Sequence, residues 1–113
     1  MPPKRNPLNL NPLQLKTLTL LQELARLTAS PAAEDDGGIA ISDFPHPHGD
    51  HFHLGEAVVA ARDATGLRNP AVWAALHRKG LIRPKLPEAM VLTPLGQQYD
   101  TGLRDRILQR AAD

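Results

Sequence analysis

The segment "FPHPHGDHFHLGE", residues 44–56, contains four of the five histidines of the chain. Neutral imidazole is a preferred ligand of Zn²⁺, Ni²⁺ and Cu²⁺. Side chains two residues apart in an extended backbone point to the same side, so the first two histidines would pair, and so would the last two. The candidate ligands are His46, His48, His51 and His53, with Asp43, Asp50 or Glu56 as oxygen ligands. The residues therefore allow a metal-responsive loop, or imidazoles that only form local hydrogen bonds or take up protons near neutral pH.

The string His46-Pro47-His48-Gly49-Asp50-His51 resembles the zinc signature of the metallo-β-lactamase superfamily. Members of that superfamily are large αβ/βα sandwiches with further metal ligands far downstream. Here the only histidine after His53 is His77, and it falls in a predicted helix. The chain also lacks a recognisable nucleophile–base motif and a glycine-rich phosphate loop. We therefore predict that the protein is not an enzyme, and the sequence identifies no small-molecule substrate.

The composition indicates one globular domain. The chain has 113 residues, 42% of them apolar, and no cysteine, which excludes disulfides and thiolate metal sites and is typical of the cytoplasm. No stretch approaches the ~20 apolar residues of a membrane helix, so a membrane partner is not expected. The net charge of +1 neither requires nor forbids a nucleic-acid partner, because the clustering of charge matters more.

A flexible arm is expected over residues 1–10, and Asn11-Pro12 then predicts the start of a helix through a cap and a first-turn proline. The leucines from Leu13 to Leu27 form an apolar arc wider than one core face needs. This helix is therefore either deeply buried or in contact with another subunit.

The remaining elements follow from caps, glycines and periodicity. A short strand is expected within "GIAISDF", and a second helix from Leu54 to Gly66. Asn69-Pro70 opens a third helix that Gly80 ends, with Val72 and Leu76 facing inward. A hairpin follows over 81–93, and Thr93-Pro94 starts a last helix with an apolar residue every fourth position from Leu95 to Ile107.

This order resembles a winged helix-turn-helix domain of the kind found in MarR-like transcriptional regulators. The segments "GLRNPAVWAALHRKGLI" and "LTPLGQQY" carry the resemblance, which covers about Leu54 to Tyr99. It implies a mainly α fold with a small β-hairpin, ordered α-[β]-α-α-β-β-α, over 11–113. One departure is Arg62, which stands where the family usually has a small residue and indicates a turn that is one residue longer.

The resemblance implies a small transcriptional regulator that binds duplex DNA, with helix 69–79 in the major groove and hairpin 81–93 as the wing. The predicted DNA-binding residues are Arg62, Arg68, Asn69, Ala71, Trp73, His77, Arg78, Lys79, Arg83 and Lys85. Alanines and Trp73 dominate the middle of the helix, however, and they read base edges poorly. The alternative is a protein–protein interaction module on the same scaffold, or packing of Trp73 within the chain.

The terminal helices also predict a homodimer, since paired regulators place two reading helices on one face of DNA. The expected dimer interface consists of Leu18, Leu21, Leu95, Tyr99, Leu103 and Ile107. The alternative is that these helices pack on each other within a monomer.

Overall fold

The computed structural model describes residues 6–27, 37–42, 44, 49–85 and 89–110. Its elements, in chain order, are α1 (Pro12–Leu27), β1 (Ile39–Ile41), β2 (His51–Leu54), β3 (Ala57–Ala60), the 3₁₀ helix η1 (Ala61–Arg68), α2 (Pro70–Arg78), β4 (Ile82–Lys85), β5 (Ala89–Leu92), α3 (Pro94–Gln98), α4 (Arg104–Ile107) and β6 (Gln109–Arg110). Helices are thus combined with antiparallel strands, and the strand content exceeds that of the predicted mainly α fold.

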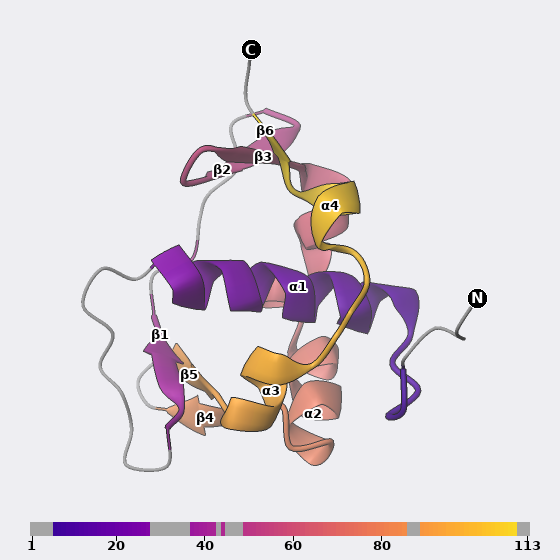
Figure 1. Cartoon of the computed structure of the whole chain (residues 1–113), viewed down its shortest axis with the longest axis vertical. Helices are drawn as coiled ribbons and strands as arrows, with labels where there is room; N and C mark the ends of the chain where they lie inside the picture. Colours follow the sequence, from indigo (N-terminus) through magenta and orange to yellow (C-terminus); the bar gives the residue numbers. More distant parts are fainter. Residues whose placement is uncertain (1–5, 28–36, 43, 45–48, 86–88, 111–113) are drawn as a thin grey trace.

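Helix α1 lies at the centre, with structure on both of its sides (Figure 1). One side carries the sheet β1-β5-β4 with α2 and α3, and the other carries the sheet β2-β3-β6 with α4. Leu18, Leu20 and Leu21 are completely buried. Even Thr17 and Thr19 are buried, and their hydroxyls donate to backbone carbonyls one turn earlier in the helix. The wide apolar arc is therefore explained by deep burial within one chain.

The predicted hairpin is confirmed as β4–β5, and the predicted short strand is confirmed as β1. Strand β5 is the middle strand of its sheet, because Leu92 lies opposite Ile39 on one side and Ile82 on the other. Ile82, Met90 and Leu92 are buried. Alternating side chains of this small sheet thus contribute to the core that α1 covers.

The predicted second helix, over 54–66, is wrong for residues 54–60, and from Ala61 it is a 3₁₀ helix. Its first half is the hairpin β2–β3, in which Leu54 lies opposite Ala57 across a two-residue turn. Gly55 has φ +59°, the conformation that the first position of a type II′ turn requires. The β-branched Val58 and Val59 favour a strand. The apolar spacing that suggests a helix here is produced instead by two short strands of a hairpin.

Gly66 has a different role from the predicted helix stop. It lies inside η1, where φ is not positive, and a Cβ built on it would lie 1.9 Å from Thr17 Oγ1. Thr17 is held in place because its hydroxyl donates to the carbonyl of Leu13 at 2.8 Å. Gly66 therefore allows η1 to pack directly on α1.

The predicted C-terminal helix begins as expected and then breaks. Thr93 caps α3 by accepting a hydrogen bond from the Gly96 amide at 3.1 Å. After Gln98 the chain leaves the helix. The Asp100 side chain accepts from the Gly102 amide at 3.0 Å, and Gly102 has φ +72°. This local turn competes with the helix, so the predicted single face from Leu95 to Ile107 does not form.

Residues 6–10 differ from the expected flexible arm, whose residues 1–5 lie outside the described part. The Tyr99 hydroxyl donates to Asn6 Oδ1 at 2.6 Å and accepts from the Leu8 amide at 3.1 Å. Leu10 is buried in the core. These contacts attach the segment to the body of the molecule just before α1.

Candidate functional site

Helix α2 forms where the sequence predicts it, and its cap is formed by Asn69. The Asn69 side chain accepts a hydrogen bond from the Ala71 amide at 2.9 Å, and Pro70 occupies the first turn. Val72 and Leu76 are buried, as predicted. Gly80 has φ +78° and ends the helix. The outer face that remains carries five exposed residues: Pro70, Ala71, Ala74, His77 and Arg78.

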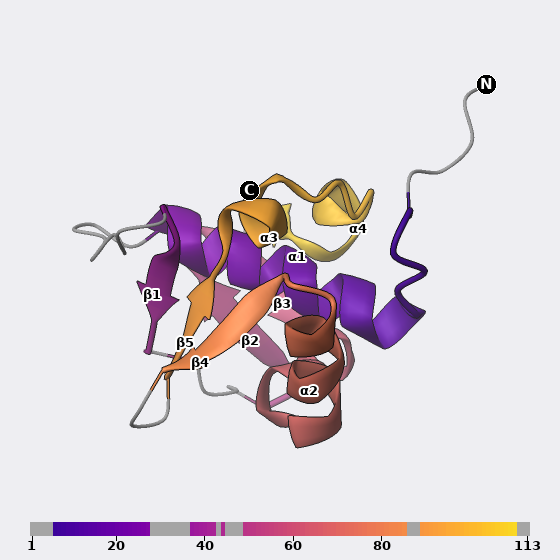
Figure 2. The same cartoon turned by 90° about the horizontal axis from the view of Figure 1, so that it is seen from below.

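Strand β4 follows α2 directly and packs against it (Figure 2). Between Ala64 and Pro87 the chain has five Lys and Arg residues and no Asp or Glu, although its net charge is only +1. Arg68 and Arg78 are exposed near the two ends of α2, and Lys85 is exposed on β4. Arg83 is half-buried. We call this set of side chains, Arg68, Arg78, Arg83 and Lys85, the basic face.

Three of the predicted DNA-binding residues serve other roles. Trp73 is half-buried; its indole N–H donates to the Leu67 carbonyl at 2.9 Å, and its ring packs on Phe44 with centroids 5.6 Å apart. Lys79 Nζ donates to the Leu8 carbonyl at 2.7 Å and so holds the N-terminal segment. Asn69 Oδ1 is engaged by the cap. Arg62 is exposed, but it lies on η1, which runs behind α1 (Figure 1).

The predicted dimer interface is not one surface. Leu18, Leu21, Tyr99 and Ile107 are all buried within the chain, each with no more than 8% of its surface exposed. Leu95 is half exposed, and Leu103 is intermediate. The burial of Leu18, Leu21, Tyr99 and Ile107 agrees with the alternative, in which the terminal elements pack together within the monomer.

Two of the four predicted histidine ligands, His46 and His48, lie outside the described residues, as does Asp43. His51 and His53 both lie on β2 and point to the same side, as expected, with their Nε2 atoms 3.1 Å apart. Asp50 Oδ1 lies 3.3 Å from His51 Nδ1. Glu56 is in the turn at the opposite end of the strand. Within the described ranges no group of three or more His, Asp or Glu comes together as metal ligands.

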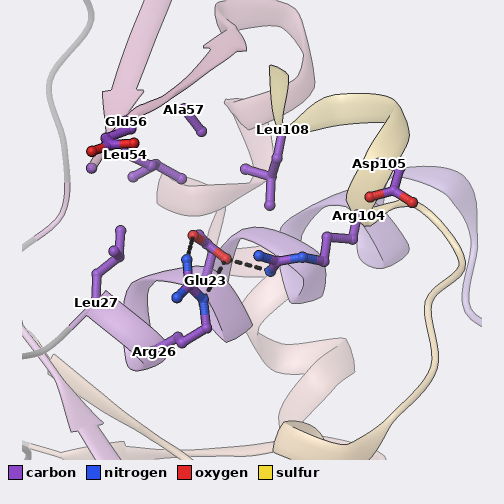
Figure 3. Close-up of a pocket in the computed structure, with 10 residues that line it drawn as sticks. Glu23, Arg26, Leu27, Leu54, Glu56, Ala57, Arg104, Asp105 and Leu108 are labelled. Carbon is purple, nitrogen blue, oxygen red and sulfur yellow. Dashed lines mark hydrogen bonds and ion pairs between the residues drawn. The ribbon is translucent and has the colours of Figure 1, made fainter. Parts of the chain in front are cut away.

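A pocket of about 430 Å³ lies between α1, the β2–β3 hairpin and α4 (Figure 3). At its base Glu23, whose side chain is 4% exposed, binds the guanidinium groups of both Arg26 and Arg104. Burial raises the pKa of Glu23, but the hydrogen bonds and charges of the two arginines outweigh burial and hold this pKa below its ordinary value. The three side chains therefore join α4 to α1.

Sequence reasoning missed this cluster. The spacing of Glu23 and Arg26 is a recognisable ion-pair signal within a helix. No local pattern connects either residue to Arg104, which lies 81 positions later than Glu23. Because the carboxylate and the guanidinium groups satisfy each other, we assign this cluster a structural role.

No family model, curated protein or solved structure matches this chain. Within the described part, no helix combines the length and the apolar character needed to cross a membrane.

Proposed function

We propose that the protein binds duplex DNA as a winged-helix protein, with α2 in the major groove and the β4–β5 hairpin against the phosphate backbone. The element order supports the proposal: α1, β1, η1, α2, β4, β5 and α3 follow the order α-β-α-α-β-β-α. In this arrangement η1 takes the place of the helix that precedes the reading helix, and the β2–β3 hairpin is an addition before it.

The observation that carries the proposal is the basic face on α2 and β4. Arg68 lies just before the Asn69 cap of α2 and Arg78 is its last residue, and the nine residues of α2 span about 13 Å along the helix axis. The major groove is about 12 Å wide. A helix seated in the groove would thus bring Arg68, just before its start, and Arg78, at its end, near phosphates on opposite sides. The side chains of Arg83 and Lys85 would reach the backbone from the hairpin.

The chemistry of α2 favours binding through shape and phosphates over base reading. Ala71 and Ala74 offer only methyl groups to the groove, which suit contacts with thymine methyls. His77 and Arg78 are the donors on the exposed face of the helix. We therefore propose that most of the affinity is electrostatic and that sequence preference is weak.

Fluorescence anisotropy on a labelled 20-base-pair duplex tests the proposal. Four phosphate contacts predict that the logarithm of the binding constant falls with the logarithm of salt concentration with a slope of about −3.6, or about 150-fold between 50 and 200 mM salt. The double variant Arg68→Ala/Arg78→Ala should reduce that slope by about 1.8.

The matched control is Arg106→Ala. This arginine is exposed on α4, on the other side of α1 from α2 (Figure 1). The control removes one charge and should leave both the affinity and the salt slope close to those of the wild type. Binding that does not respond to salt, or an equal loss per charge in the control, would refute the proposal.

The competing proposal of a protein-docking surface relied on Trp73 as an exposed anchor. The hydrogen bond of its indole to Leu67 and its contact with Phe44 engage this side chain within the chain. The remaining outer face of α2 is small and basic, which suits DNA better than an apolar partner.

A further inference from the structure

We infer that His51 and His53 form a two-imidazole site for a divalent transition metal ion of the Zn²⁺, Ni²⁺ and Cu²⁺ class. The two side chains lie next to each other on β2, with ring centroids 4.8 Å apart and an angle of 79° between the ring planes. Their Nε2 atoms are the closest polar atoms of the pair, 3.1 Å apart. Both nitrogens therefore lie close together on one side of the strand.

The distance between the nitrogens fits a shared ion. If each nitrogen lies about 2.0–2.1 Å from the metal, a separation of 3.1 Å corresponds to an angle at the metal of about 95–102°. This value lies between the roughly 90° of square-planar or octahedral ligands and the roughly 109° of tetrahedral ones. The spacing of the pair thus fits two ligands of one ion.

The hairpin holds the pair in position. His51 lies opposite Ala60 and His53 opposite Val58 in the β2–β3 ladder. The strand register thus sets the spacing of the two imidazoles. The turn before β2 is also held, because the Ala61 amide donates to the Asp50 carbonyl at 2.8 Å. A preformed arrangement of ligands reduces the ordering cost of binding.

Asp50 is the positioning residue of this site. Its carboxylate oxygen lies 3.3 Å from Nδ1 of His51, so Nδ1 can carry the proton and donate to the carboxylate. That tautomer leaves Nε2 as the metal-binding nitrogen, in the manner of the carboxylate–histidine pairs that orient metal ligands. Two imidazoles supply only part of the coordination sphere of such an ion, so the remaining positions fall to other ligands.

The competing explanation is an imidazole–imidazole hydrogen bond, in which one Nε2–H donates to the other nitrogen and no metal binds. Isothermal titration calorimetry of the whole chain with ZnCl₂ or NiCl₂ alone distinguishes the two. We expect one ion per chain for the wild type. His53→Ala should weaken binding by more than about tenfold, since loss of an orienting neighbour alone costs about 10–100-fold. Asp50→Asn should weaken metal binding by about 10–100-fold.

Two variants serve as controls. His77→Ala removes an exposed imidazole on α2 and should bind metal like the wild type. The double variant His46→Ala/His48→Ala removes the neighbouring histidines in the sequence and should also keep the site. Loss of binding in either control to the extent seen in His53→Ala, or unchanged binding in His53→Ala, would overturn the inference.

A spectroscopic readout tests the ligands directly. The electron paramagnetic resonance spectrum of the Cu²⁺-loaded chain should show coupling to two equivalent imidazole nitrogens in the wild type and to one in His53→Ala. Cu²⁺ should also bind more tightly than Ni²⁺ or Zn²⁺, because affinity for nitrogen ligands follows that order. A spectrum without nitrogen coupling would refute the inference independently of any measurement on DNA.

Discussion

The contact between Gly66 and Thr17 makes a quantitative prediction about how η1 is attached to α1. Gly66→Ala would place a methyl carbon 1.9 Å from Thr17 Oγ1, where contacts under 3.0 Å are essentially never seen. One of the two groups would have to move by about 1 Å. Thr17 cannot rotate away freely, because it is completely buried and its hydroxyl donates to Leu13.

Two effects of opposite sign act in this variant. Gly66 does not have a positive φ, so alanine can adopt its backbone conformation. Because alanine lowers the conformational entropy of the unfolded chain, the substitution would by itself stabilise the fold by about 0.4–1 kcal/mol. Overpacking in a core costs about 1–3 kcal/mol and occasionally more, and the severity of this overlap places the cost at the upper end. We expect a net loss of about 2 kcal/mol in the free energy of unfolding.

Urea unfolding followed by circular dichroism measures this loss, and a double-mutant cycle assigns it to the contact. Thr17→Ala removes Oγ1, so Gly66→Ala should cost much less in that background, and the coupling energy should reach about 1 kcal/mol or more. Thr17→Ser keeps the hydroxyl and should give no such relief. A Gly66→Ala variant within about 0.5 kcal/mol of the wild type, or strictly additive effects in the cycle, would contradict the packing argument.

Two further predictions concern the charged cluster and Trp73. Because the arginines hold the pKa of Glu23 below its ordinary value, the ion-paired carboxylate stabilises the fold at neutral pH, and this contribution is lost as the pH falls through the lowered pKa of the folded state. The free energy of unfolding of Glu23→Gln should therefore change less between pH 7 and pH 3 than that of the wild type, and parallel pH profiles would contradict the assignment. Trp73→Phe keeps an aromatic ring beside Phe44 but loses the hydrogen bond to the Leu67 carbonyl, so it should cost about 1 kcal/mol of stability in urea titrations and leave the affinity for duplex DNA unchanged. A Trp73→Phe variant with normal stability and impaired DNA binding would show that Trp73 belongs to the DNA-binding surface.

Local signals in the sequence predicted the elements that they directly encode. Asn69 and Thr93, each followed by proline, form side-chain caps at the start of α2 and α3. Gly80 ends α2 with a positive φ. The two short β-prone runs "LIRP" and "MVLT" also predicted β4 and β5. Each of these signals acts within a few residues, so no distant contact was needed to recognise it.

Prediction failed where a distant contact or a short competing motif decides the conformation. The apolar spacing after Leu54 is compatible with a helix, but Gly55 turns the chain back and the β2–β3 pairing uses the same residues. The break after Gln98 depends on Asp100 and Gly102 and on the half-buried Gln22, whose side chain donates to the carbonyls of Gly96 and Tyr99. A periodicity argument does not include these contacts.

The sequence alone predicted the first helix, the capped helix α2 with its inward Val72 and Leu76, and the basic residues around α2 and the following hairpin. It placed His51 and His53 on one side of an extended backbone, but it did not predict strand β2. The tertiary structure alone decided which apolar faces meet: it buried Leu18, Leu21, Tyr99 and Ile107 within one chain, engaged Trp73 with Phe44, and brought Arg104 to Glu23. The physical reason is the distance along the sequence over which each kind of interaction acts. Caps, turns and side-chain alternation depend on neighbours a few residues away, whereas burial and ion pairing depend on segments as far as 81 residues apart.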